Sequence, residues 1–202
     1  MEKKKYRLVL ASASPRRRDL LNMMGVGFDL RPTSADEKLP ESIAPDEAVK
    51  MLAERKAAAA AEKAADDELI VAADTMVFLD GRLLGKPRDK DDAFRMLKML
   101  SGRTHEVYSG LAVAADGRVF SKAVGTSVTF RDLSDEEILW YIDTGEPLDK
   151  AGAYGVQGRA AVFVRSISGE YHNVVGLPLC DLEMMLGEHF DLSLRDFAAK
   201  SR

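Results

Sequence analysis

The fold is decided by "LVLASASPRRRDLL", residues 8–21, in which an apolar strand pattern leads through two serines into a helix pattern. Ser14 is a good N-cap and Pro15 suits a first helical turn. We therefore expect a helix over residues 15–24 that ends at Gly25. A strand that leads directly into a helix is typical of α/β proteins.

The rest of the chain continues this mixed pattern. Strands are expected over residues 6–12 and 27–34, on both sides of a turn at Asp80-Gly81, on both sides of a turn at Asp116-Gly117, and on both sides of a turn at Ser168-Gly169. Helices are expected over residues 47–66 with Asp46 as the cap, over 90–100 up to Gly102, over 134–143 with a Ser134–Glu137 capping box up to Gly145, and from about Pro178. Residues 149–158 form a glycine-bearing loop, and the tail after about residue 193 is expected to fray.

Composition limits the class of protein. The 202 residues are 46% hydrophobic with a net charge of -4, which suits one mixed α/β domain over residues 1–202 and gives no basic domain for nucleic acid. No apolar run is long enough for a membrane span or a signal peptide, so no membrane partner is expected. The single cysteine excludes internal disulfides and predicts a reducing, cytoplasmic location. Because Cys180 lies at an apolar helix start, we expect a buried thiol.

Three like charges at a helix start raise a chemical question. Arg16, Arg17 and Arg18 follow the serine turn, where free backbone N–H groups of the helix bind anions. Guanidinium groups add paired donors that suit phosphate, so a polyanionic ligand would offset the repulsion. The alternative is a solvated basic helix face that pairs with carboxylates elsewhere.

Asp74 is the second unusual residue. The stretch "LIVAADTMVFL" is apolar on both sides of Asp74 and Thr75. A carboxylate in such a strand is costly to bury unless it is paired, bound to a metal or used in chemistry. The alternative is an aspartate at a strand end that accepts hydrogen bonds from backbone amides.

Other signals are weaker alone. "GKP" offers Lys86 as a phosphate contact, and Asp36 with Glu37 could hold a hard cation, although a solvated acidic loop is the simpler alternative. Lys56, on the long helix, is expected on a solvent face. In "GEPLDKAGAYGVQG", glycines allow close approach to a ligand and Gln157 offers an amide that can read a base edge. The glycine spacing does not match a dinucleotide-binding fingerprint.

Six motifs occur in order over about residues 6–179: LASASPRR, ADT before an apolar run, GKP, SGRTHEVYSGLAV, GEPLDKAGAYGVQG and VVGLPL. Together they resemble the Maf family of nucleoside triphosphate pyrophosphatases. The resemblance implies an α/β fold with a mixed, twisted β-sheet flanked by helices and two lobes around a central cleft, similar to inosine triphosphate pyrophosphatase. It implies hydrolysis of a nucleoside triphosphate to the monophosphate and pyrophosphate with a divalent metal cation, Mg²⁺ or Mn²⁺.

The segment GEPLDKAGAYGVQG resembles the branch associated with dTTP and UTP, rather than the one associated with 7-methyl-GTP. Modified pyrimidine nucleotides are included in this expectation. The resemblance implies that Asp74 is the proton acceptor and that Arg16, Thr75 and Gln157 determine substrate choice. The remaining expected roles are phosphate binding by Ser12, Ser14, Arg17, Lys56 and Lys86, and metal binding by Glu37 with Asp74.

Two other classes stay open. One is a nucleotide-binding regulator of septation or cell shape without turnover, and release of pyrophosphate separates it from an enzyme. The other is a different phosphate-ester hydrolase, such as a sugar-nucleotide hydrolase, which a substrate panel separates. The nucleoside triphosphate substrate is the expected partner, and a homodimer is one expected assembly because homodimers are common among relatives.

Overall fold

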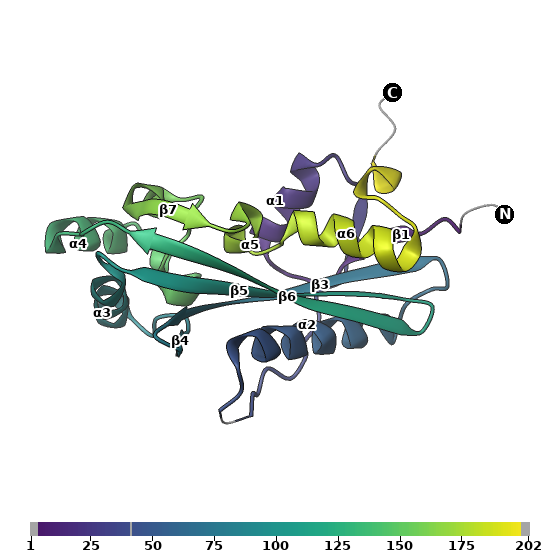
Figure 1. Cartoon of the computed structure of the whole chain (residues 1–202), viewed down its shortest axis with the longest axis horizontal. Helices are drawn as coiled ribbons and strands as arrows, with labels where there is room; N and C mark the ends of the chain where they lie inside the picture. The colour runs from purple at the N-terminus through teal and green to yellow at the C-terminus, as the bar shows by residue number, and fades with distance from the viewer. Residues whose placement is uncertain (1–3, 41, 199–202) are drawn as a thin grey trace. The chain divides into compact units, whose positions relative to one another are not determined.

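The computed structural model describes residues 4–40 and 42–198 of the chain (Figure 1). The strands are β1 (Arg7–Leu10), β2 (Phe28–Leu30), β3 (Glu68–Leu79), β4 (Arg82–Leu84), β5 (Thr104–Ala115), β6 (Arg118–Phe130) and β7 (Val164–Ser168). The α-helices are α1 (Pro15–Met23), α2 (Pro45–Ala61), α3 (Lys90–Leu100), α4 (Asp135–Asp143), α5 (Tyr171–Val175) and α6 (Leu179–Phe190). Short 3₁₀ helices are η1 (Glu146–Asp149), η2 (Ala151–Ala153), η3 (Arg159–Phe163) and η4 (Leu194–Phe197).

The strands form one mixed sheet in the order β2-β1-β3-β5-β6-β7, with β4 paired to β3. β1 pairs in parallel with both β2 and β3, whereas β4 and β7 pair antiparallel with β3 and β6. The parallel pairs come from the strand-helix-strand connections through α1 and α2, because parallel neighbours need a crossover. The predicted α/β class with a mixed sheet flanked by helices is confirmed.

By its internal contacts the chain divides into two compact units. Unit 1 consists of Met1–Asp74, Ser109–Val124 and Gly176–Arg202, and unit 2 consists of Thr75–Tyr108 and Gly125–Val175. The division falls inside β3, β5 and β6, and it separates Asp74 from Thr75. A single domain over residues 1–202 and a central cleft stay predictions.

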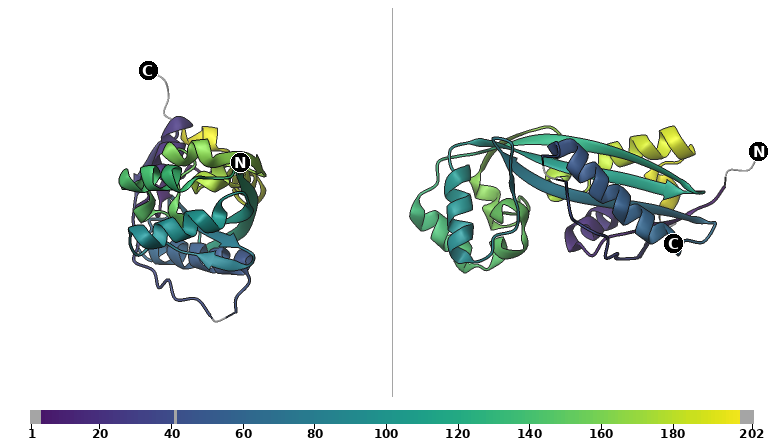
Figure 2. Two further views of the ribbon diagram at one scale, coloured as in Figure 1. Left: turned by 90° about the vertical axis from the view of Figure 1, so that its left-hand side faces the viewer. Right: turned by 90° about the horizontal axis from the view of Figure 1, so that it is seen from below.

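In unit 1, helices cover both faces of the strands. α2 lies on one face, and α1 and α6 lie on the other, as the views in Figures 1 and 2 agree. The core under α2 is made of small side chains: Val9, Ala11, Ala53, Ala57, Ala60, Ile70, Ala72, Ala112 and Ala114. The alanine run therefore serves as helix former and as packing surface together.

Gly110 on β5 allows α2 to approach the sheet closely. A Cβ atom at this position would lie 1.9 Å from the carbonyl oxygen of Val49. No side chain fits in that space, because backbone atoms of the helix occupy it.

Unit 2 is built around aromatic side chains. Phe130, Tyr141 and Phe163 are fully buried and Tyr154 is nearly so. Their rings meet edge to face, with centroids 4.8 Å apart for Phe130–Tyr154 and 5.3 Å apart for Tyr141–Phe163. α3 and α4 pack beside each other and beside η1 and η2.

Several local signals are confirmed. Asp80-Gly81 and Asp116-Gly117 have positive φ at both residues, 50° and 74° in the first turn and 53° and 70° in the second, which is the geometry of tight hairpin turns. Ser134 and Glu137 form the predicted capping box of α4, with both reciprocal hydrogen bonds present.

The bounds predicted for two early elements are wrong. α2 begins at Pro45 with Ala44 as the N-cap, because proline fits the first helical turn, and Asp46 lies inside that turn. The helix ends at Ala61 rather than 66, and Arg31 donates to the free carbonyl of Ala60 in its last turn. β2 ends at Leu30, and the following Pro32 has no N–H with which to continue a strand.

The region after Gly169 is a helix, not the predicted strand. The side-chain amide of Asn173 in α5 donates to the carbonyl of Val107 at 3.0 Å and to Thr126 Oγ1 at 2.9 Å. Thr126 in turn donates to the carbonyl of Glu170 at 3.1 Å. These buried long-range hydrogen bonds outweigh the strand pattern of the segment.

The tail is ordered as far as residue 198, against the prediction of fraying after 193. η4 has its own capping box of Ser193 and Asp196. The Phe197 carbonyl accepts from the amide of Gly27 at 2.8 Å, and Leu194 is buried. Residues 199–202 of the predicted frayed tail lie outside the described residues.

The prediction of a buried Cys180 is wrong, because this thiol is exposed. The buried face of α6 consists of Leu179, Leu182, Met185 and Leu186. Cys180 lies about 100° around the helix from Leu179, so its side chain points away from that face.

Candidate active site

The serine turn between β1 and α1 is organised around one hydroxyl. Ser12 Oγ accepts from the backbone N–H of Ser14 at 3.1 Å and from Arg17 Nη1 at 3.1 Å. Ser14 occupies the predicted N-cap position, but its side chain makes no capping hydrogen bond. The buried Ser12 hydroxyl therefore fixes the turn before the helix and ties it to the second arginine, while the first N–H groups of α1 receive no side-chain cap.

Arg17 is held on a second side by the Gly176 carbonyl, to which its Nε donates at 2.7 Å. Burial lowers the pKa of the Arg17 guanidinium, nearby Asp74 acts in the opposite direction, and Arg16 lowers the pKa further. Arg16 is half-buried, whereas Arg18 is exposed. The three consecutive arginines therefore have different surroundings.

Asp74 ends the buried run of β3 within unit 1. Side chains alternate along a strand, so Asp74 lies on the face that carries Ile70 and Ala72, the face packed against α2. On that helix Lys56 donates to Asp74 Oδ1 and also contacts Glu37 Oε1 at 2.9 Å. The side chains of Lys56 and Asp74 are only 15% and 13% exposed, against 68% for Glu37.

This geometry corrects the expectation that Lys56 lies on a solvent face. Its ammonium group bridges two carboxylates from distant parts of the sequence. Neighbouring Arg55 donates to the carbonyls of Asp36 and Lys38, at 3.1 and 2.6 Å, and so ties the acidic loop to the same helix. Helical periodicity alone could not show this, because the loop that covers the helix face has no regular structure.

The donor set can be compared with what a metal requires. Within the described part of the chain, no group of three or more His, Cys, Asp or Glu side chains is placed to hold an ion. Magnesium, however, is often held by one or two carboxylates together with substrate phosphates and water. Glu37 and Asp74, which converge on Lys56 Nζ, fit that smaller requirement.

The other predicted residues belong to unit 2. Thr75 is half-buried on β3, while Lys86 and Gln157 are exposed. The amide of Gly152 donates to the carbonyl of Gly85 at 3.0 Å. Unit 2 thus joins the GKP motif to the GEPLDKAGAYGVQG segment, which the sequence separates by about 60 residues.

Sequence reasoning gave no role to the side chains that hold this segment. Glu146 Oε1 accepts from the Tyr141 hydroxyl at 3.0 Å, and Glu146 Oε2 accepts from the backbone N–H of Arg159 at 3.1 Å. Lys150 donates to the Glu146 carbonyl at 2.7 Å. Glu146 and Lys150 lie inside a recognised motif, but Tyr141 looks like an ordinary core residue of α4 and carries no sequence signal.

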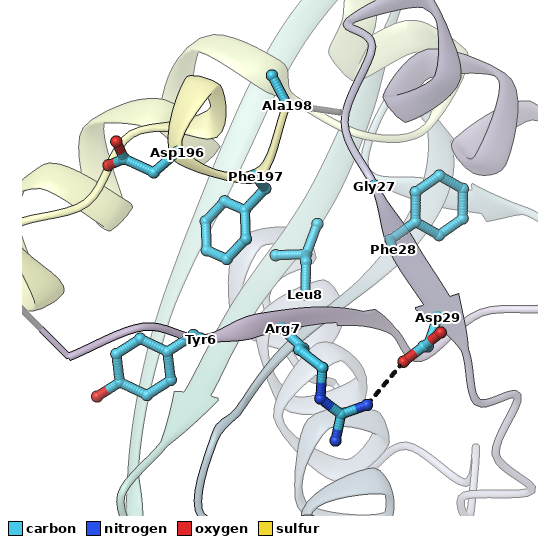
Figure 3. A pocket seen from close by; sticks show the side chains of 9 residues that line it. All are labelled: Tyr6, Arg7, Leu8, Gly27, Phe28, Asp29, Asp196, Phe197 and Ala198. Carbon is cyan, nitrogen blue, oxygen red and sulfur yellow. Dashed lines mark hydrogen bonds and ion pairs between the residues drawn. The ribbon is translucent and has the colours of Figure 1, made fainter. Parts of the chain in front are cut away.

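A hollow elsewhere in unit 1 contains none of the predicted site residues. It is lined by Tyr6, Arg7, Leu8, Gly27, Phe28, Asp29, Asp196, Phe197 and Ala198 (Figure 3). Arg7, its cation, is paired with Asp29 at 3.1 Å and with Asp67 at 2.9 Å. We do not place the active site here, because the hollow is lined by none of the residues predicted to bind phosphate, hold a metal or act as the base.

Comparison with known proteins agrees with the motifs. Proteins named dTTP/UTP pyrophosphatase include one from Alkaliphilus oremlandii, 48% identical over 93% of this chain and 98% of its own, and one from Pelotomaculum thermopropionicum, 50% identical over 89% and 94%. A third with that name, from Bacillus velezensis, is 43% identical over 90% and 96%.

A solved structure described as a nucleoside-triphosphatase / dITP/XTP pyrophosphatase from Mycobacterium abscessus aligns with 63% of this chain and 75% of its own, at 16% identity and a TM-score of 0.40. That likeness is too distant to add to the assignment. No helix among residues 4–40 and 42–198 combines the length and apolar character of a membrane span. Residues 7–189 match the family described as Maf-like protein, and with these relatives the match shows that the chain belongs to the Maf-like family.

Proposed function

We propose that this protein is a nucleoside triphosphate pyrophosphatase that hydrolyses dTTP and UTP to the monophosphate and pyrophosphate. The observation that carries the reaction class is the Lys56-bridged pair of carboxylates, Glu37 and Asp74, in the same unit as the arginine-bearing helix start. Such a group offers cations for a polyphosphate and a carboxylate for activating water. The pyrimidine substrates are supported by the names of relatives that are 43–50% identical over most of the chain.

In this mechanism Asp74 orients and deprotonates a water molecule that attacks the α-phosphorus, and pyrophosphate leaves. Arg17 and Lys56 offset the negative charge of the triphosphate. The Ser12–Ser14 turn offers the helix N-terminus to the same anion, and Lys86 is a further phosphate contact proposed from the resemblance. Arg16, Thr75 and Gln157 are proposed to select the substrate, also from the resemblance.

Glu37 and Asp74 are proposed to hold a divalent cation, Mg²⁺ or Mn²⁺. When bound, such a cation would neutralise phosphate charge and polarise a phosphoryl oxygen. Lys56 contacts both carboxylates, so its ammonium group would give up these contacts when a cation binds and would then be available to the phosphates. A cytoplasmic location, a homodimer, and the lack of nucleic-acid and membrane partners stay predictions from the sequence.

The test is a panel of dTTP, UTP, CTP, GTP, ATP and 7-methyl-GTP with Mg²⁺ or Mn²⁺, with products separated by anion-exchange chromatography. We expect monophosphate and pyrophosphate in equal amounts, fastest from dTTP and UTP. Release of single orthophosphate, or a clear preference for 7-methyl-GTP, contradicts the proposal. Tight nucleotide binding without turnover would favour the regulator instead.

A further inference from the structure

Gln157 lies in the short irregular segment 154–158, between the end of η2 at Ala153 and the start of η3 at Arg159. Within this segment the Gly158 amide donates to the Gly155 carbonyl at 3.0 Å and closes a turn. An exposed amide side chain on so short a turn is directed by whatever fixes the backbone on each side of it. Here the backbone on each side of Gln157 is fixed by two side chains, Tyr141 of α4 and Glu146 of η1.

The Glu146 carboxylate holds the second half of the segment. Its Oε2 accepts from the backbone N–H of Arg159 at 3.1 Å. The backbone of Gly158 lies so close to it that a Cβ atom there would be 1.8 Å from Glu146 Oε1. The residue directly after Gln157 therefore rests on this carboxylate.

The Tyr141 hydroxyl holds the first half. It donates to Glu146 Oε1 at 3.0 Å and accepts from the backbone N–H of Gly155 at 3.2 Å. Burial raises the pKa of Tyr141, and the negative charge of Glu146 raises it further, so the hydroxyl keeps the proton that it donates. A chain of hydrogen bonds thus connects the backbone before Gln157 to the backbone after it, through Gly155, Tyr141, Glu146 and Arg159.

We propose that Glu146, acting together with Tyr141, is a positioning residue that fixes the Gln157 side chain and thereby sets the preference between bases. This inference rests on the proposed function, in which Gln157 reads the base. Glu146 is proposed to touch neither the substrate nor the reacting atoms. Its effect passes through the backbone on both sides of Gln157, so it depends on Gln157 being present.

The decisive experiment is a double-mutant cycle of Glu146→Gln and Gln157→Ala. Glutamine keeps the size of Glu146 but replaces one acceptor oxygen by a donor, so residue 146 can no longer accept from both the Tyr141 hydroxyl and the Arg159 amide. In the Gln157 background we expect the ratio of kcat/KM for UTP to that for GTP to fall about three- to tenfold, the value of one or two lost hydrogen bonds. In the Gln157→Ala background the same change should leave the ratio unaltered.

A loss of folding would not produce this pattern, because it lowers turnover of both substrates equally. Tyr141→Phe is the second variant, since it keeps the ring contact with Phe163 and removes only the hydroxyl; it should lower the ratio in the same way. Asp80→Asn is the matched control: it weakens an exposed ion pair with Arg103 in the same unit, on neither α4 nor η1, and should leave the ratio unchanged. An unchanged ratio in Glu146→Gln, or an equal fall in both backgrounds, overturns the proposal.

Amide hydrogen exchange measures how firmly the backbone beside Gln157 is held, and it does not depend on turnover. The amides of Gly155 and Arg159 should exchange faster in Glu146→Gln than in the wild type, and unchanged exchange at both overturns the proposal. If the wild-type protein shows no preference for UTP, the proposed function fails. Faster exchange at the two amides would in that case still support Glu146 as the residue that positions Gln157.

Discussion

Two regions of this molecule present polar groups by opposite means. In unit 1, Arg17, Lys56 and Asp74 stand on regular elements, the helices α1 and α2 and the strand β3. In unit 2, Gln157 stands on irregular backbone held by the polar side chains of Glu146 and Tyr141. Changes to Arg17, Lys56 or Asp74 should therefore affect every triphosphate alike, whereas changes around Gln157 should affect the choice among them.

The largest effect is expected for Asp74→Asn, which keeps the shape but removes the charge. Turnover should fall about 10²- to 10⁴-fold if only general-base help is lost. The protein should still fold, because a neutral amide is cheaper to desolvate than a carboxylate. Thermal melting and steady-state rates on the same sample check both parts.

The control for that variant is Asp80→Asn in the turn that follows β3. Asp80 is exposed at a turn with φ of 50°, a conformation that asparagine tolerates. Its rate should stay close to that of the wild type. A folded Asp74→Asn protein with a near-native rate would remove Asp74 from the mechanism.

Next comes Arg17→Ala, which tests whether the unit 1 cations act through phosphate. Losing a close charge contact of this kind costs on the order of 2–5 kcal/mol, and kcat/KM should fall by a similar factor for every triphosphate. Arg18→Ala, an exposed arginine on the same helix, is the matched control and should change little. An Arg17→Ala enzyme with altered base preference and unaltered overall rate would contradict the assignment of Arg17 to phosphate binding and of base selection to the region of Gln157.

The third prediction concerns unit 2 and pH. His105 is buried, its Nε2 lies 2.7 Å from the Tyr154 hydroxyl, and burial lowers its pKa to about 4. The unfolded chain titrates near pH 6.5, so between these values it binds a proton that the folded protein does not. Stability should therefore fall as the pH drops from 6.5 to 4, by roughly 3 kcal/mol in total.

Urea unfolding at several pH values between 4 and 7 measures this slope. His105→Gln should be less stable overall and should show a flatter dependence on pH in that window. If the slope of the variant equals that of the wild type, other groups account for the acid sensitivity.

The smallest effect is expected for Gln157→Ala. The ratio of kcat/KM for UTP to that for GTP should fall about tenfold or less, since one amide contact to a base is lost. The rate on GTP should be nearly unchanged, because the phosphate contacts stay in place. An equal fall in kcat/KM for all substrates would indicate that Gln157, like Arg17, acts on the phosphates, and the two regions would then not differ in role.

Where the sequence predicted the structure well, the signal was local. Asp80-Gly81, the Ser134–Glu137 box and Pro15 each specify a conformation within four residues. For α5 and the C-terminal tail, where the prediction failed, the deciding partner was far away: Asn173 donates to Val107, and Phe197 accepts from Gly27. No periodicity within one segment contains such information.

The candidate site followed the same rule. Asp74 stood out because a carboxylate in an apolar strand is costly wherever the strand packs. Lys56 was placed on the wrong surface because only the folded chain brings Glu37 and Asp74 to it. Tyr141 could not be found at all, since its hydroxyl acts on a segment fourteen residues away along the chain.

The bare backbone of Gly110 has a consequence for Lys56. Val49, whose carbonyl lies against Gly110, precedes Lys56 by seven residues, two helical turns or about 10 Å along the axis. Both residues lie on the single helix α2. A side chain at position 110 would push the helix away from the sheet at Val49, and the Lys56 ammonium group would move away from Asp74 with it. The distance between Lys56 and Asp74 thus depends on the absence of a side chain at Gly110 of β5, and Gly110→Ala should increase that distance.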